Sequence, residues 1–154
     1  MFKPHYFAYG SNMNPARVAE RGLLASEPRR ARLPNFRLRF NKRNVREPGL
    51  GHANVVYEQG HDVEGVLYTL AGPDEILKMD PFERAPINYG RDCVLVYPDD
   101  EPPVWTWIYY ANRALQEDGL VPPLTYLEHL LAGEAFLSAS YVEFLRSFKA
   151  VARG

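Results

Sequence analysis

The clearest structural signal in the sequence is the run Tyr6-Phe7-Ala8-Tyr9-Gly10-Ser11-Asn12-Met13, which Asn14-Pro15 follows. Its aromatic first half predicts a strand that ends at Gly10, where glycine permits a sharp turn or the close approach of a ligand. Asn14 suits the N-cap of a helix and Pro15 its first position. A strand that runs into a helix N-terminus leaves backbone N–H groups free to hold an anion. On local chemistry alone, this corner is either an anion-binding loop or an ordinary strand–turn–helix junction.

The composition is that of a globular protein. With 154 residues, 46% of them hydrophobic and 24% charged, the chain is large enough for a real core, and we expect a single domain over residues 1–154. No stretch approaches the roughly 18 apolar residues of a membrane span. The one cysteine excludes an internal disulfide framework. We therefore expect a cytoplasmic protein that is a monomer or homodimer.

A basic stretch interrupts the otherwise balanced charge. Eight basic residues and no acid lie between Arg29 and Arg46, although the formal net charge is only −1. A nucleic-acid surface is one interpretation. In Phe36-Arg37-Leu38-Arg39-Phe40, however, apolar residues alternate with arginines, which predicts a strand with one buried and one solvated face. We expect no nucleic-acid partner and no membrane partner, although the stretch could attract an anionic substrate.

Strand patterns fill the first two thirds of the chain and helix patterns the end. Strands are predicted over residues 5–9, 36–41, 53–57, 63–70, 91–97 and 104–109. Helices are predicted over residues 15–21, 73–79, 124–131 and from residue 141 onward, and residues 28–34 are expected to form a basic connection. This order is not a repeating βαβ series. It indicates an α+β fold, with a mixed or antiparallel sheet curled into a small barrel and flanked by helices.

Two side chains are candidates for a catalytic or binding site. Glu83 follows the predicted short helix among aromatic residues and prolines, and such surroundings raise the pKa of a carboxyl group and make it a better base. A loop acid paired with Arg84 is the plainer alternative. Tyr126 follows Pro122-Pro123 and could offer its hydroxyl to a cleft, although simple helix packing also explains it.

Metal and thiol chemistry have little support. The four histidines lack the spacing and the cysteine partners of a zinc site, so we expect no metal. Cys93 lies in the apolar run Asp92-Cys93-Val94-Leu95-Val96 and is expected to pack as a small hydrophobic side chain.

Taken together, the segments resemble the γ-glutamylcyclotransferase family and its AIG2-like relatives. Residues 6–13 are similar to the family's signature loop nearly letter for letter, and Met79-Asp80-Pro81-Phe82-Glu83 resembles the segment that carries its essential glutamate. Residues 51–56 and 63–68 resemble its central strands, and residues 122–145 its closing segment. The resemblance covers almost the whole chain in order.

This resemblance implies an acyltransferase that needs no cofactor. The α-amine of a γ-glutamyl group attacks its own γ-carbonyl, which yields 5-oxoproline and a free amine or amino acid. By match to the family motif, Glu83 is the base, and backbone N–H groups near Gly10 and Ser11 stabilise the oxyanion. The other substrate-binding residues that the resemblance implies are Tyr6, Phe7, Ala8, Tyr9, Asn12, Tyr89 and Tyr126. The hypothesis requires Glu83 to lie unpaired beside the Gly10-Ser11 turn, with a cavity between them.

The departures from the family pattern concern the leaving group. Arg84-Ala85-Pro86 stands where relatives commonly have a glycine, and Leu124 replaces a frequent serine. A free γ-glutamyl amino acid, a γ-glutamyl amine and a larger γ-glutamyl metabolite all remain open, with glutathione disfavoured. A non-catalytic module of the same fold that binds or senses a small metabolite is the alternative function.

Overall fold

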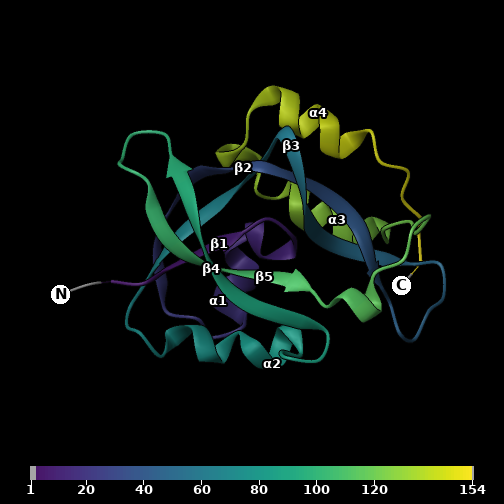
Figure 1. The fold of residues 1–154 in the computed structure, drawn as a ribbon, viewed down its shortest axis with the longest axis horizontal. Helices are drawn as coiled ribbons and strands as arrows, with labels where there is room; N and C mark the ends of the chain where they lie inside the picture. Colours follow the sequence, from purple (N-terminus) through teal and green to yellow (C-terminus); the bar gives the residue numbers. More distant parts are fainter. Residues whose placement is uncertain (1–2, 154) are drawn as a thin grey trace.

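The computed structural model describes residues 3–153, which form a small barrel with helices around it (Figure 1). Its strands are β1 (His5–Ala8), β2 (Ala25–Arg43), β3 (Gly51–Leu70), β4 (Tyr89–Pro98) and β5 (Val104–Ala111). Its α-helices are α1 (Pro15–Glu20), α2 (Asp80–Glu83), α3 (Leu124–Leu131) and α4 (Ala139–Arg146). Short 3₁₀ turns are η1 (Ser11–Met13), η2 (Glu75–Lys78), η3 (Arg113–Leu115) and η4 (Glu134–Phe136).

The five strands close into a mixed barrel in the order β1-β3-β2-β4-β5. All neighbouring strands are antiparallel except β5 and β1, which run parallel and meet where Tyr6 lies opposite Trp107. The apolar side chains of β1 fill the interior, and Phe7 is completely buried. The predicted α+β barrel with flanking helices is therefore confirmed.

The strands β2 and β3 are longer than the sequence suggested. The expected connection over residues 28–34 was wrong, because these residues belong to β2 and pair with β3. The pairing register shifts near Glu27 and Asn35, both of which have positive φ values. Such bulges absorb an extra residue and tolerate the missing N–H of Pro28 and Pro34. The segment with two prolines, which its sequence predicts to be a loop, is therefore part of the continuous strand β2.

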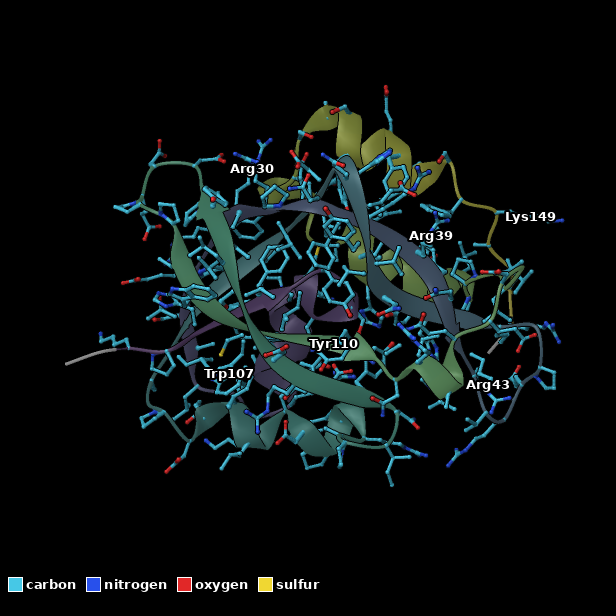
Figure 2. All side chains as sticks on the ribbon, viewed as in Figure 1. Arg30, Arg39, Arg43, Trp107, Tyr110 and Lys149 are labelled. Carbon is cyan, nitrogen blue, oxygen red and sulfur yellow. The ribbon has the colours of Figure 1, made fainter. Side chains whose placement is uncertain are left out.

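The basic stretch forms a solvated strand face, as its alternation predicted. Leu38 and Phe40 of β2 are buried, whereas Arg39 is exposed and donates to Glu58 of β3 at 3.0 Å. Figure 2 shows Arg30, Arg39 and Arg43 at the periphery along β2. Arg30 also faces an acid of β3, Glu64, at 3.5 Å. Acids on the neighbouring strand thus balance part of this positive charge.

Helix α3 lies between the N-terminal loop and the C-terminal segment. It packs on η1 and on α4, and α4 lies along the side of the barrel formed by β2 and β3 (Figure 1). The start of α3 is fixed by Val151, whose carbonyl accepts from Leu124 N at 2.7 Å and whose N–H donates to Pro122 O at 3.1 Å. This pair of bonds is called the C-terminal clasp below. None of the helices within residues 3–153 has the length and apolar character that a membrane crossing needs.

The prediction for Cys93 was wrong, because its side chain is exposed. Strand β4 meets β2 only near Tyr97 and Pro98, so the stretch around Cys93 has β5 as its one neighbouring strand. The apolar run is therefore only partly buried: Val96 is in the core, whereas Cys93 is exposed.

Candidate functional site

A cavity of about 290 Å³ opens at one end of the barrel. It lies between the loop after β1, the end of α2, the paired ends of β2 and β3, and the start of α3. Every site residue expected from the sequence lines it except one: Tyr6, Phe7, Tyr9, Gly10, Ser11, Asn12, Glu83, Tyr89 and Tyr126 do so. The exception is Ala8, which is buried in β1 opposite Val66. Segments far apart in sequence therefore meet around one space.

The loop after β1 has the geometry expected of a capped helix start. Asn14 accepts a hydrogen bond from Ala16 N at 3.1 Å and caps α1. A Cβ atom on Gly10 would lie only 3.1 Å from the Tyr126 hydroxyl oxygen, so glycine allows α3 to approach the loop. The backbone N–H groups of Gly10 and Ser11 donate to no acceptor within residues 3–153. Two donors thus remain for a ligand at this corner.

Asn12 organises the loop and links it to Glu83. Its Nδ2 atom lies 2.9 Å from the Tyr6 hydroxyl oxygen and 3.3 Å from Glu83 Oε1, and its Oδ1 accepts from Arg21 at 3.0 Å. Its backbone carbonyl accepts from the Tyr68 hydroxyl at 2.7 Å. Because Asn12 is held on all sides, it fixes the position of the carboxylate it contacts.

Glu83 is the last residue of α2 and its side chain is 17% exposed, at the cavity. The helix ends there because Arg84 adopts a left-handed conformation, with φ of 49°. Burial raises the pKa of Glu83, and the nearby charges of Arg21, Arg17 and Lys42 oppose that rise. A carboxyl group in this setting can exchange a proton nearer to neutral pH than an exposed glutamate.

The expectation that Glu83 is unpaired was wrong. Arg21 places a guanidinium nitrogen 3.8 Å from Glu83 Oε1 and lies over the Phe82 ring. The contact is long, and Arg21 makes its shorter bond to Asn12. The cavity between Glu83 and Gly10 is nevertheless present. The plainer alternative, a pair with Arg84, is not found among the ion pairs of the described residues.

Two tyrosines hold the peptide of Ala53 from opposite sides. Tyr89 donates its hydroxyl hydrogen to Ala53 O at 2.8 Å, and Tyr126 accepts from Ala53 N at 3.1 Å. Burial raises the pKa of both hydroxyl groups, so they stay protonated. The Tyr126 hydroxyl donates to no acceptor within residues 3–153, which leaves its hydrogen for a ligand in the cavity.

The sequence did not reveal the cations of the site. Arg17, Arg21 and Lys42 line the cavity together with Arg46 and Arg84, so that positive groups outnumber Glu83, the one acid among the described lining residues. Arg17 and Arg21 are four residues apart on and just after α1, which places them on one side. Lys42 lies two residues after Phe40, on the inward face of β2, and this alternation was a usable signal. Such a site favours a ligand with net negative charge.

His52, beside Lys42 in the β2–β3 register, is expected to remain neutral down to acid pH. Burial, with the nearby Lys42 and Arg17, lowers the pKa of His52 to about 4. Between about pH 6.5 and pH 4 the unfolded chain then binds a proton that the folded chain does not, so stability falls with falling pH. Histidine-selective NMR should show a neutral His52 at pH 5.5. The variant His52→Gln should flatten the pH dependence of unfolding in that window, and an unaltered slope would contradict the assignment.

The cavity residues include no cluster that suggests a metal. Within residues 3–153, no three His, Cys, Asp or Glu side chains come together as ligands. The described lining of the cavity offers a carboxylate, hydroxyl groups, backbone N–H groups and cations.

Known proteins share this fold, and one family model matches the sequence. A family model described as "Gamma-glutamyl cyclotransferase, AIG2-like" matches residues 6–128. A solved structure named gamma-glutamyl cyclotransferase superposes with a TM-score of 0.84 at 21% identity, covering 99% of this chain and 91% of that one. An uncharacterised protein from Homo sapiens gives a TM-score of 0.84 at 24% identity, with the same two coverages of 99% and 91%. YkqA from Bacillus subtilis gives 0.77 at 23% identity, over 98% of this chain and 57% of that one. No curated protein sequence matches this chain.

Proposed function

Because this chain belongs to the gamma-glutamyl cyclotransferase, AIG2-like family, we propose that it cyclises a γ-glutamyl compound to 5-oxoproline and releases an amine or amino acid. The family and the fold support cyclotransferase-like activity. The observation that carries the finer proposal is the position of Glu83, a half-buried carboxylate held by Asn12 at the wall of a cavity that Gly10 and Ser11 also line.

The first step is deprotonation of the substrate. The α-ammonium of the γ-glutamyl group approaches Glu83, which is the only acid that lines the cavity within the described residues. Glu83 accepts one proton, and the resulting amine can attack. The raised pKa of Glu83 brings its basicity closer to that of the amine, which favours proton transfer.

In the second step, one carbon–nitrogen bond forms and another one breaks. The α-nitrogen bonds to the γ-carbonyl carbon, and the carbonyl oxygen becomes an oxyanion near the free N–H groups of Gly10 and Ser11. One donor of this kind contributes about 3 kcal/mol in other enzymes. The bond to the leaving nitrogen then breaks. Two protons in total pass from the α-ammonium to the leaving nitrogen, and Glu83 is the group that carries them.

The cavity also has to fold the substrate back on itself. Positioning two groups of one molecule for reaction can contribute as much as about 7–11 kcal/mol. The tyrosine walls, with Tyr6 stacked on Tyr68 and edge-on to Tyr109, are packed closely enough to hold such a conformation.

Incubation with γ-glutamylalanine is expected to yield 5-oxoproline and alanine, measured by mass spectrometry. The isomer α-glutamylalanine is the matched control, since its amide bond lies at the wrong carbon and should give no enzymatic product. A panel of γ-glutamyl amino acids and amines that yields no 5-oxoproline would contradict the proposal. Binding without product would instead favour a metabolite-binding module.

A further inference from the structure

Five cationic side chains of the described residues line the cavity: Arg17, Arg21, Lys42, Arg46 and Arg84. Arg84 follows α2 and Arg46 lies in the loop after β2, and the two groups that concern the substrate here are those of α1 and the end of β2. Arg17 and Arg21 approach from α1, whereas Lys42 approaches from the end of β2. Arg21 lies 3.8 Å from Glu83, and Lys42 makes no ion pair with Glu83. A ligand that occupies the cavity therefore meets positive charge at two places. The role of Lys42 at the second place rests on the proposed function.

The first cation group suits the α-carboxylate of the glutamyl unit. In an α-amino acid, the ammonium and the carboxylate are attached to the same carbon. If Glu83 attracts the ammonium, then a cation close to Glu83 is in reach of the carboxylate, and Arg21 is that cation. This use of Arg21 leaves Lys42 without a role in binding the glutamyl unit.

Lys42 is a largely buried residue whose ammonium faces the cavity without a hydrogen-bond or ion-pair partner among the described residues. The residue as a whole is only 4% exposed, but its ammonium is accessible at the cavity, where it forms no hydrogen bond and no ion pair with any residue in the range 3–153. The Tyr89 ring has its centroid 5.8 Å from Nζ. Burial and the charges of Arg84 and Arg43 lower the pKa of Lys42, and the charge of Glu83 opposes that shift without forming an ion pair. A buried lysine is normally paired, because burial of an isolated charge is costly. An anion from outside the chain would supply the missing partner.

We propose that Lys42 binds a carboxylate on the leaving group, and so selects γ-glutamyl amino acids over γ-glutamyl amines that lack a carboxylate. The two carboxylates of such a substrate lie at its two ends, as the two cation groups lie at two places in the cavity. A γ-glutamyl amine carries only one carboxylate and would leave Lys42 unpaired. Lys42 is then a specificity residue, separate from the base.

Two substrates isolate this carboxylate. γ-Glutamylethylamide differs from γ-glutamylalanine only by a hydrogen in place of the leaving-group carboxylate. The wild-type protein should favour γ-glutamylalanine in kcat/KM by about 10- to 100-fold, the usual effect of one charged hydrogen bond. Lys42→Met should reduce this preference to about 3-fold or less, and Lys42→Arg should restore part of it. The ratio is the readout because it cancels any effect of Lys42 on the basicity of Glu83.

Arg39→Met is the matched control. Arg39 is a cation of the same strand, but it is exposed, pairs with Glu58 and does not line the cavity. Its replacement should leave the substrate preference unchanged. A wild-type protein that uses both compounds equally, or a Lys42→Met variant that keeps the preference, would overturn the role of Lys42 while the cyclotransferase proposal stands.

The two proposals fail in distinguishable ways. If neither compound yields 5-oxoproline, the cyclotransferase proposal fails. Titration calorimetry with the same compounds then decides the role of Lys42. Tighter binding of γ-glutamylalanine that Lys42→Met abolishes would support it, and equal binding of both compounds would overturn it.

Discussion

Glu83→Gln is expected to lower kcat for 5-oxoproline formation by about 10²- to 10⁴-fold, the range for removal of a general base. Glutamine has nearly the same shape and can still face Asn12 and Arg21, so the fold and the affinity for substrate should change little. Stopped assays with mass spectrometry would give kcat, and circular dichroism would check the fold.

The pH dependence provides a second readout of the same group. Only the ionised form of Glu83 can accept a proton, and burial raises its pKa above the usual 4.5. The kcat/KM of the wild-type protein should therefore fall as pH drops through this raised pKa, at higher pH than for an exposed glutamate. The residual activity of Glu83→Gln should lack that acid limb.

Glu143→Gln is the control for this substitution. Glu143 is an exposed glutamate of α4 and does not line the cavity. Its change to glutamine should leave both kcat and the pH profile as they are. Undiminished turnover by Glu83→Gln would remove Glu83 from the mechanism, whatever the control shows.

Gly65→Ala is expected to destabilise the protein by about 3 kcal/mol or more, at the upper end of the cost of overpacking. A Cβ atom on Gly65 of β3 would lie 2.4 Å from Ala8 O and 2.7 Å from the Phe7 ring. The clash with Ala8 involves a backbone atom in a paired strand, which cannot turn aside as a flexible side chain would. Urea unfolding followed by circular dichroism would measure the loss.

Gly72→Ala is the matched control for that loss. A Cβ atom on Gly72 meets no atom within 4 Å, and Gly72 has no positive φ. The same chemical change should therefore alter the free energy of unfolding by less than about 0.5 kcal/mol. Equal stability of the Gly65→Ala and wild-type proteins would mean that β1 and β3 are less tightly packed than described.

The parts of the site that lie close together in sequence were predictable. Gly10 and the Asn14 cap follow from the local preferences of a strand that meets a helix, and the structure has both. The solvated face of β2 followed from simple alternation. In each case the physical cause operates over a few residues, so a single sequence is sufficient to detect it.

Long-range contacts explain what the sequence did not reveal. The pairing of Glu83 with Arg21 depends on how α1 and α2 face each other across the loop, and no local pattern contains that information. Cys93 looked buried because its neighbours are apolar, but burial depends on which layer covers the strand. Residues 28–34 resembled a loop because they contain two prolines. The bulges that allow prolines within β2 depend on its pairing with β3, which the local sequence does not contain.

The C-terminal clasp has a consequence for where the folding unit ends. The region matched by the family model stops at residue 128, yet Val151 closes the start of the helix that carries Tyr126. Three residues before Val151, Phe148 packs edge-on against Phe40 of β2, with ring centroids 4.7 Å apart. We infer that a truncated chain ending at residue 128 would lose the restraint on Tyr126, and that the smallest autonomous version of this protein extends to Val151.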